Sequence, residues 1–256
     1  MNILITGAKG FVGRNLCEAL KNIRDGKDRV HKVEVSEIYE FDIDTPKEKL
    51  DEYCAKADFV FNLAGVNRPK DNSEFMAGNF GFASELLDTL KKHNNKAPVM
   101  LSSSIQASLE GRYAGSEYGK SKLAGEELFK KYAEETGVRV LIYRFPNLFG
   151  KWCRPNYNSA VATFCNNIAN DLPITVNDRA VELELLYIDD LVEEMTHLGK
   201  ANQEVKLGIP PMISSIVFPG IMKDLKKTYP MTSLAVTERW MDIAMQSQHT
   251  MLLLVR

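Results

Sequence analysis

Apolar residues along the first 150 positions alternate between two periods. Short runs rich in Val, Ile, Leu and Phe have the length of buried strands and lie at residues 2–6, 38–42, 58–63, 99–101 and 138–143. Between them, apolar residues recur every three or four positions, which is typical of amphipathic helices, along residues 11–23, 75–90 and 117–132. Strands that alternate with helices of this length predict parallel crossover units. We therefore expect an α/β fold, a doubly wound parallel sheet of the Rossmann type.

The alternation of strands and helices ends near Gly150. The pattern then predicts a loop over residues 151–157, a helix over about 159–170, an alternating apolar segment over 181–185 and a helix capped by Asp189 and Asp190. We expect a dinucleotide-binding domain over residues 1–150 and a smaller C-terminal substrate-binding region over 151–256, with residues 181–200 packing back on the sheet. Residues 211–256 show no clear period and end in an apolar run, to which the sequence assigns no role.

Composition and charge narrow the function classes. The 256 residues carry 34 acidic and 32 basic side chains, and this near-neutral balance predicts neither nucleic acid nor a membrane surface as a partner. No apolar stretch reaches the ~18 residues of a membrane span. The four cysteines lie far apart in the sequence, which favours free thiols and a cytoplasmic protein. The four histidines are scattered, so we expect no metal site.

Three glycines follow the first predicted strand and open the first predicted helix. Gly7, Gly10 and Gly13 have the spacing that lets a chain turn tightly, approach a pyrophosphate with its backbone and pack a helix on a strand. The helix N-terminus adds the positive end of its dipole. We expect a dinucleotide to bind over residues 7–13, with Gly7, Lys9, Gly10, Phe11, Val12 and Gly13 as contacts.

The type of dinucleotide is left open by the sequence. Asp42, with Asp44 behind it, is the candidate acid for the adenine ribose hydroxyls, although it follows Gly13 by 29 residues where ~20 is common. Lys9 and Arg14 are placed where they could instead meet a 2′-phosphate. Both NAD(H) and NADP(H) therefore remain possible.

A phenol and an amine lie four residues apart on the predicted helix over 117–132. Tyr118 and Lys122 share one helical face, and they follow the hydroxyl run Ser102, Ser103 and Ser104 at the end of a predicted buried strand. A tyrosine with a pKa near ~10 needs help to act at neutral pH, and a neighbouring ammonium favours the phenolate. We expect a proton relay in which a serine hydroxyl and Tyr118 meet the same substrate oxygen.

These motifs together resemble the extended short-chain dehydrogenase/reductases of the NAD-dependent nucleotide-sugar epimerase/dehydratase family, over roughly residues 1–200. The resemblance implies Ser104, Tyr118 and Lys122 as the catalytic set, with Ser103 as the alternative serine. It also implies homodimers formed through two long helices. The further contacts that it implies are Leu63, Ala64, Gly65, Asn79, Tyr118, Lys122 and Phe145 for the cofactor, and Ser103, Ser104, Asn147, Asn158 and Arg179 for the substrate.

A closer similarity is to the reductase half of bifunctional capsular polysaccharide enzymes, carried by residues 102–106, 146–153 and 155–159. It implies NADP(H) and a UDP-linked 4-keto-6-deoxy-N-acetylhexosamine as the substrate. Such enzymes usually continue into a metal-binding cupin half, which we do not expect within these residues.

The resemblance leaves three candidate reactions and one non-enzymatic role for this chain. Dehydratases of the family carry an Asp-Glu pair where this chain has Ile105 and Gln106, so elimination is disfavoured. A 4-keto-sugar reductase is favoured. A C4-epimerase and a non-catalytic dinucleotide sensor or scaffold remain as alternatives.

Overall fold

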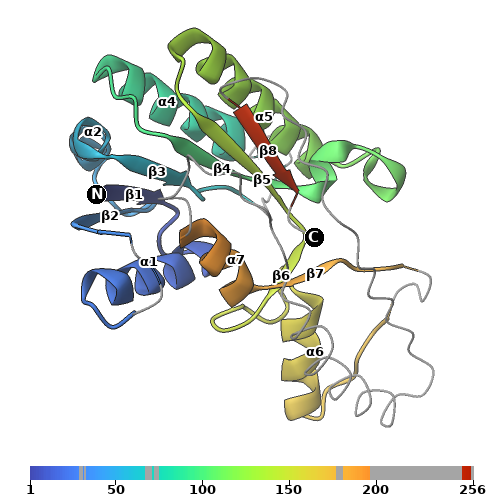
Figure 1. The fold of residues 1–256 in the computed structure, drawn as a ribbon. Coiled ribbons are helices and arrows are strands. Elements are labelled where there is room, and N and C mark those ends of the chain that lie inside the picture. The colour runs from blue at the N-terminus through green and yellow to red at the C-terminus, as the bar shows by residue number, and fades with distance from the viewer. Residues whose placement is uncertain are drawn as a thin grey trace.

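The computed structural model describes residues 1–28, 31, 33–66, 71, 75–176, 181–196 and 250–254. Its centre is a six-stranded parallel sheet in the order β2-β1-β3-β4-β5-β8 (Figure 1). The strands are β1 (Asn2–Thr6), β2 (Glu37–Phe41), β3 (Phe59–Asn62), β4 (Val99–Ser104), β5 (Val140–Phe145) and β8 (Thr250–Leu254). The expected α/β fold with a parallel sheet is confirmed.

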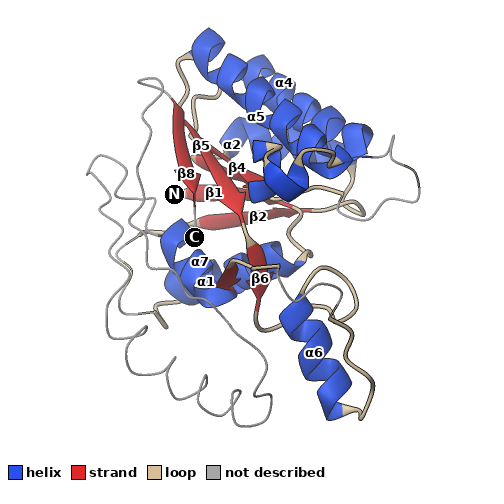
Figure 2. Cartoon of the chain, turned by 90° about the vertical axis from the view of Figure 1, so that its right-hand side faces the viewer, coloured by secondary structure: helices blue, strands red, loops and turns tan. Residues whose placement is uncertain are grey.

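Helices cover both faces of this sheet. α1 (Phe11–Arg24) and α7 (Ile188–Thr196) lie on one face, and α2 (Lys47–Lys56), α4 (Phe82–Lys92) and α5 (Glu117–Thr136) lie on the other (Figures 1 and 2). β1 shows how the sequence builds this arrangement: Ile3 and Ile5 pack into the core beneath α1, whereas Leu4 packs into the core beneath α4. A strand buried on both faces reads as a continuous apolar run, and for this reason the runs were recognisable in the sequence.

The sheet order reverses direction at β1. The chain goes from β1 outward to β2 and then returns across β1 to β3, so the crevice at the carboxyl ends of β1 and β3 is a topological switch point. Ligands bind at such points in open α/β sheets. The distance of 29 residues between Gly13 and Asp42 is long because a long link joins Arg24 to Glu37. Asp42 nevertheless directly follows β2, the strand next to β1, where the acid that binds the adenine ribose is expected.

A smaller region lies beyond the end of β5. It contains β6 (Asn147–Phe149), which pairs in parallel with β7 (Leu185–Tyr187), and α6 (Ala160–Ala169) (Figure 2). The alternating segment predicted over 181–185 is thus a strand only from Leu185 on. Asp189 and Asp190 lie inside the first turn of α7 and do not cap it from outside.

Two further elements depart from the expected pattern. The helix predicted over 75–90 begins as a π-helix, η1 (Met76–Gly81), and continues as α4. The apolar run near the end of the chain, to which no role was assigned, contributes β8 beside β5. Two short 3₁₀ turns, η2 (Ile105–Ser108) and η3 (Gly111–Tyr113), connect β4 to α5.

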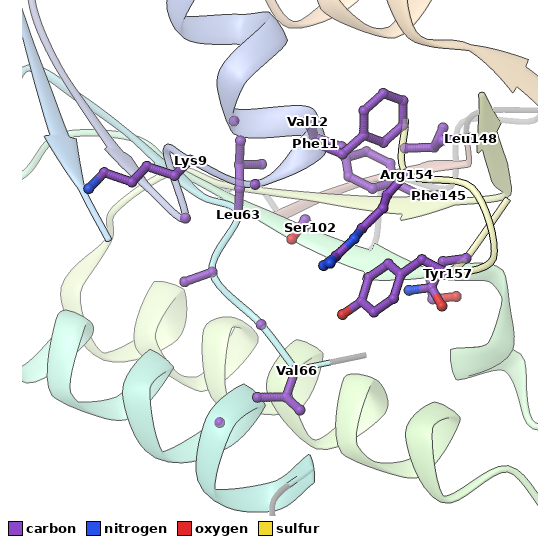
Figure 3. Close-up of a pocket in the computed structure, with 18 of the residues that line it drawn as sticks. Lys9, Phe11, Val12, Leu63, Val66, Ser102, Phe145, Leu148, Arg154 and Tyr157 are labelled. Carbon is purple, nitrogen blue, oxygen red and sulfur yellow. The ribbon is translucent and has the colours of Figure 1, made fainter. Parts of the chain in front are cut away.

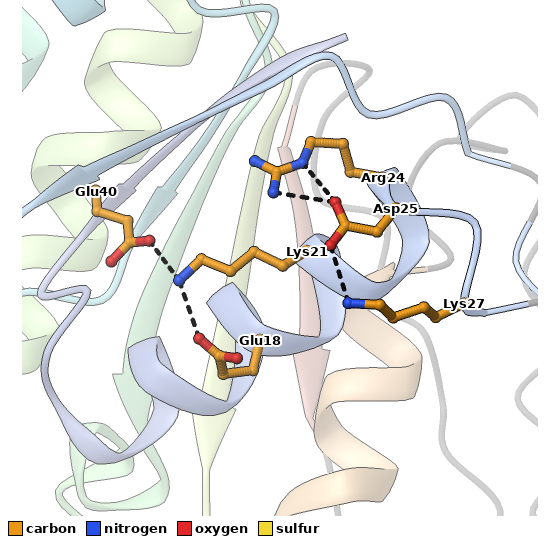
Figure 4. Close-up of polar contacts among 6 residues, drawn as sticks. All are labelled: Glu18, Lys21, Arg24, Asp25, Lys27 and Glu40. Atoms are coloured by element: carbon orange, nitrogen blue, oxygen red, sulfur yellow. Dashed lines mark hydrogen bonds and ion pairs between the residues drawn. The ribbon is translucent and has the colours of Figure 1, made fainter.

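Surface ion pairs fasten α1 to its surroundings. Lys21 Nζ lies 2.9 Å from Glu18 Oε1 on the same helix and 2.9 Å from Glu40 Oε1 on β2 (Figure 4). Asp25, at the end of α1, accepts from Arg24 and Lys27. Because these groups are partly exposed, each pair contributes at most about 1 kcal/mol.

All four cysteines lie in the described part of the chain and are free thiols, with Cys17 and Cys54 buried. None of the described helices is both long enough and apolar enough to cross a membrane.

Candidate active site

An open cleft of about 1460 Å³ runs across the carboxyl ends of the strands (Figure 3). Its volume exceeds the ~300–1000 Å³ of pockets that hold one small molecule. One end is lined by the glycine loop and the end of β2, and the other by the loop over residues 152–159 and by α6. The size and length of the cleft suit two ligands that meet near its middle.

The glycine loop is packed so closely that only hydrogen fits at two positions. Gly7 has φ +67°, and a Cβ on it would lie 2.7 Å from the Ala64 backbone nitrogen. A Cβ on Gly13 would lie 2.1 Å from the Gly7 carbonyl oxygen. Gly10 is the N-cap of α1 and provides no side-chain cap, so the N–H groups of the first turn remain available. This cradle fits the pyrophosphate of a dinucleotide, which backbone N–H groups and a helix dipole can hold.

The end of the cleft beside β2 is lined by two lysines and two carboxylates, Lys9, Lys47, Asp42 and Glu85. Asp42 accepts the Lys9 backbone N–H at 2.7 Å and the Ile43 N–H at 2.8 Å, so its carboxylate shapes the glycine loop. The Lys9 ammonium forms an exposed ion pair with Asp44. Of the two cations considered for a 2′-phosphate, Lys9 lines the cleft, whereas Arg14 stacks on the Trp152 ring at 4.4 Å.

The end of β3 forms the middle of the cleft floor through Leu63, Ala64 and Gly65. Asn79 lies behind it: its Oδ1 accepts the Val66 N–H at 2.9 Å, and its Nδ2 donates to the Val66 carbonyl at 3.1 Å and to Ser121 Oγ at 3.1 Å. Asn79 is not among the described residues that line the cleft. It fastens the end of β3 to α5.

The predicted catalytic residues come together in the cleft. Ser104, Tyr118 and Lys122 all line it, and the Ser104 hydroxyl lies close enough to the Tyr118 phenol to lower its pKa. The Lys122 ammonium lies 5.6 Å from the centre of the Tyr118 ring and donates to the Ser102 carbonyl at 3.0 Å. Ser103 also lines the cleft, but its hydroxyl donates to the buried Glu126 at 2.5 Å. Of the two serines considered, Ser103 is thus engaged by Glu126, whereas Ser104 is the one that acts on the phenol.

Burial sets the protonation of this group. It raises the pKa of Tyr118 above its ordinary value, an effect that the neighbouring Ser104 hydroxyl only partly opposes. The sequence predicted the opposite direction, because it considered the neighbouring amine and not the loss of solvent around the phenol. Burial acts in the opposite direction on the amine and lowers the pKa of Lys122 to about 8. The negative charge of Glu126 opposes part of this lowering. The phenol is therefore protonated at neutral pH and can donate.

The start of α5 is fixed by contacts with η2. Ser116 Oγ accepts the Gly119 N–H at 2.9 Å and donates to Gln106 Oε1 at 2.8 Å. A Cβ on Gly119 would lie 2.3 Å from the Gln106 carbonyl oxygen, so helix and turn are in direct backbone contact. These contacts determine how far Tyr118 extends over the cleft.

The end of the cleft away from the glycine loop is lined by side chains from β5, β6 and the loop that follows them. Asn147 and Asn158 line it, as do Phe145 and two residues that the sequence analysis did not single out, Arg154 and Tyr157. Figure 3 shows Arg154 and Tyr157 projecting into the cleft, and the Arg154 guanidinium lies 5.8 Å from the centre of the Tyr157 ring. A basic residue within a predicted polar loop was the available signal. Arg179, the predicted diphosphate ligand, lies outside the described residues.

No three His, Cys, Asp or Glu side chains are grouped to hold a metal ion within the described ranges.

Comparison with known proteins settles the family. A model of the NAD dependent epimerase/dehydratase family matches residues 3–209. The chain belongs to this family. Over 213 residues it is 42% identical to a UDP-2-acetamido-2,6-beta-L-arabino-hexul-4-ose reductase of Pseudomonas aeruginosa. The aligned segment covers 82% of this chain and 53% of the relative.

Solved structures agree with the assignment to the epimerase/dehydratase family. The capsular polysaccharide assembling protein CapF from Staphylococcus aureus matches with a TM-score of 0.66 and 47% identity, over 82% of this chain and 53% of that protein. A UDP-glucuronic acid 4-epimerase from Bacillus cereus, solved with NAD, matches with a TM-score of 0.66 and 22% identity, over 81% of this chain and 76% of its own, and shows the shared fold. The chain spans about half the length of the Pseudomonas and Staphylococcus proteins.

Proposed function

We propose that this chain is an NAD(P)H-dependent reductase of a UDP-linked 4-keto-6-deoxy-N-acetylhexosamine, in the synthesis of capsular or other surface polysaccharide precursors in the cytoplasm. One observation carries the proposal: the Tyr118 phenol, beside Lys122 and with Ser104 in the same lining, lies in a cleft whose other end is the glycine cradle. The similarity to the Pseudomonas reductase supports the choice of substrate.

Each residue of the set has a distinct role in the proposed reduction. A bound reduced nicotinamide dinucleotide supplies the hydride. Ser104 donates a hydrogen bond to the sugar carbonyl oxygen, and the protonated Tyr118 transfers its proton to that oxygen as negative charge develops on it. The raised pKa of Tyr118 suits this direction, because it keeps the donor protonated at neutral pH. Lys122 holds the nicotinamide ribose and stabilises the phenolate that the transfer leaves.

The alternative of dehydration lacks the Asp-Glu pair directly after Ser104, where this chain has Ile105 and Gln106. Gln106 occupies the position where a dehydratase has its catalytic pair, and its amide oxygen is engaged by Ser116 at 2.8 Å. Loss of water from the sugar needs a group that protonates the hydroxyl and one that removes a proton from carbon. Reduction needs only the set already described.

NADPH is the reductant that we propose, with NADH as the alternative. The resemblance to capsular reductases favours it, and Lys9 is a cleft-lining ammonium on the glycine loop that could exchange Asp44 for a 2′-phosphate. The fit of the cradle to a pyrophosphate does not depend on this choice.

For the sugar nucleotide, we propose that Arg154 holds the diphosphate while Asn147 and Asn158 contact the sugar. Among the described residues, no carboxylate lies within ion-pair distance of Arg154, although the residue lines the cleft. A guanidinium offers paired donors that match phosphate oxygens. Arg179 remains a prediction for the same group.

The proposal is tested by product and cofactor analysis. Purified protein is incubated with NADPH and a 4-keto-6-deoxy UDP-N-acetylhexosamine, and separately with UDP-N-acetylglucosamine and NAD⁺. We expect one NADPH to be consumed for each keto sugar reduced, and no interconversion of the second sugar. Epimer formation without net cofactor consumption would instead identify a C4-epimerase. Cofactor binding without turnover of either sugar would identify a sensor.

A further inference from the structure

A buried ion pair lies directly behind the catalytic residues. Tyr118, Lys122 and Glu126 follow one another at intervals of four residues, so the three side chains leave the same face of α5. The Glu126 side chain is 0% exposed, and its partner Arg144 on β5 is 17% exposed. The reaction proposed above uses the first two residues of this row and leaves the third without a role.

Glu126 joins α5 to two neighbouring strands at once. Its Oε1 accepts the Arg144 Nε–H at 2.8 Å and the Ser103 hydroxyl at 2.5 Å, while its Oε2 accepts Arg144 Nη2 at 2.7 Å. Ser103 and Arg144 are register partners on β4 and β5. Each directly precedes a residue that lines the cleft, Ser104 and Phe145. The Glu126 carboxylate therefore joins α5 to β4 and β5 next to residues that line the cleft.

Stability alone is a weak reason for this arrangement. Removing two charges from water is costly, and well-packed apolar side chains of similar volume often stabilise a protein as much as a buried pair does. What apolar side chains cannot supply is a directional, bidentate fork and a fixed charge. Both are found one helical turn from the Lys122 ammonium.

The negative charge of Glu126 matters because the Lys122 ammonium is buried. The ammonium donates to the Ser102 carbonyl on β4 and lies near the Gly65 backbone and Asn79. Among the described residues, Glu126 is the charged group that acts on Lys122. Arg144 is acted on by Glu126 and by Glu110. Burial works against the ammonium, and Glu126 is the carboxylate that opposes burial.

We propose that Glu126 is a positioning residue: clamped by Arg144 and Ser103, it sets the place of α5 against β4 and β5 and supplies a fixed negative charge beside the Lys122 ammonium. Its kinetic consequences rest on the proposed reductase function. The chemistry it serves is the proton transfer by Tyr118, which needs Lys122 both in place and charged.

The Glu126→Gln variant separates the charge from the shape. It keeps the size of the side chain and an acceptor for Ser103, but it leaves the Arg144 charge uncompensated near Lys122. We expect the alkaline limb of kcat/KM, near pH 8 in the wild type, to move down by about one pH unit. The matched control is Glu135→Gln on the same helix, which removes an exposed pair with Lys91 at 2.6 Å and should leave the limb in place.

Two conservative variants test the positioning. Glu126→Asp retains the charge but is one methylene too short for the fork, and Ser103→Ala removes one hydrogen bond. Both should lower kcat with the alkaline limb unmoved, Glu126→Asp by about tenfold. If Glu126→Gln does not fold, an unchanged kcat in Glu126→Asp still overturns the proposal. A merely structural pair would give lower melting temperatures in all three variants with wild-type pH profiles and kcat.

A binding measurement keeps this inference separate from the proposed function. Affinity for NADPH is measured by fluorescence titration across the same pH range, which requires no turnover. We expect the pH at which affinity falls to be lower in Glu126→Gln than in the wild type. Coincident binding curves would overturn the role of Glu126, whatever reaction the protein catalyses. Shifted curves without reduction of any keto sugar would support the role of Glu126 and refute the reductase.

Discussion

The two ends of the cleft differ in what lines them: backbone at one end and loop side chains at the other. At the cofactor end, the fit comes from backbone: Gly7 and Gly13 leave no room for a side chain, and the first turn of α1 lines the cleft without a side-chain cap. At the substrate end, the fit comes from side chains on a loop, in which Trp152 and Asn156 adopt positive φ values of 65° and 56°. Backbone recognition leaves a glycine pattern in the sequence, whereas recognition by loop side chains leaves little.

The substrate loop is nevertheless anchored to the cofactor helix. Asn15 Nδ2 on α1 donates to the Lys151 carbonyl at 3.1 Å, and the Arg14 guanidinium lies 4.4 Å from the centre of the Trp152 ring. A non-glycine residue at positive φ costs of the order of 1 kcal/mol, which such contacts can offset. The helix that forms the cofactor cradle therefore also positions the loop that presents Arg154.

The largest expected effect is at the junction of the two ends. Tyr118→Phe removes the proton donor and keeps the ring, so kcat for the keto sugar should fall at least ~100-fold. Affinity for NADPH, measured by fluorescence, should stay near the wild-type value. A Phe variant that reduces the sugar as fast as the wild type would show that the phenol does not transfer the proton.

Next in size is a change that breaks the cofactor end alone. Gly13→Ala places a methyl group 2.1 Å from the Gly7 carbonyl oxygen, so the loop must shift. We expect a loss of about 1–3 kcal/mol in the free energy of cofactor binding, or about 5- to 150-fold in Kd. Gly81→Ala is the control, because no atom lies within 4 Å of its added methyl group. Equal affinities in the two variants would contradict the cradle.

A change at the substrate end should leave the cofactor unaffected. Arg154→Ala removes the proposed diphosphate ligand, so KM for the UDP-sugar should rise about 10- to 100-fold, as expected for a lost charged hydrogen bond. Arg24→Ala, which removes a cation at the far end of α1, is the control. A KM that rises for NADPH and not for the sugar would place Arg154 at the wrong ligand.

The dependence on pH should follow Lys122. Burial lowers its pKa to about 8, and the proposed reaction needs the ammonium form. Because a cation loses its proton as pH rises, kcat/KM should be level below about pH 7 and fall by up to tenfold per unit above pH 8. Steady-state rates from pH 6 to about pH 10 provide the profile. A rate that rises throughout this range would mean that Lys122 does not need its proton.

The smallest effect is expected at the ribose. Lys9→Ala should raise KM for NADPH by roughly 3- to 10-fold and leave KM for NADH unchanged, because an exposed charge contact is partly screened. Measuring both cofactors with the wild type and the variant sharpens the choice between them. An equal effect on both would mean that Lys9 supports the loop and does not read a 2′-phosphate.

Local patterns predicted much of the fold and the centre of the site. The apolar runs indicated β1, β3, β4 and β5 because these strands are buried on both faces. Tyr118 and Lys122 could be named because a four-residue helical spacing brings them together, whereas the choice of Ser104 among the serines at the strand end came from the family resemblance. The homodimer through α4 and α5 stays a prediction.

What the sequence missed depends on three-dimensional surroundings. The direction of the Tyr118 pKa required knowledge of its burial, and the role of Glu126 required β4 and β5 to be neighbours. Asn79 was expected to contact the cofactor, whereas its amide is engaged by Val66 and Ser121. Arg154 lies in a loop whose path no periodicity specifies.

The most direct test of the central claim is a single-turnover experiment. Protein saturated with NADPH is mixed rapidly with a 4-keto-6-deoxy UDP-N-acetylhexosamine, and the near-ultraviolet absorbance of the reduced nicotinamide is followed while the sugar product is quantified. We predict that absorbance decays in step with formation of the 4-hydroxy sugar, one cofactor oxidised for each sugar reduced. Unchanged absorbance, with both ligands shown to be bound, would contradict the assignment.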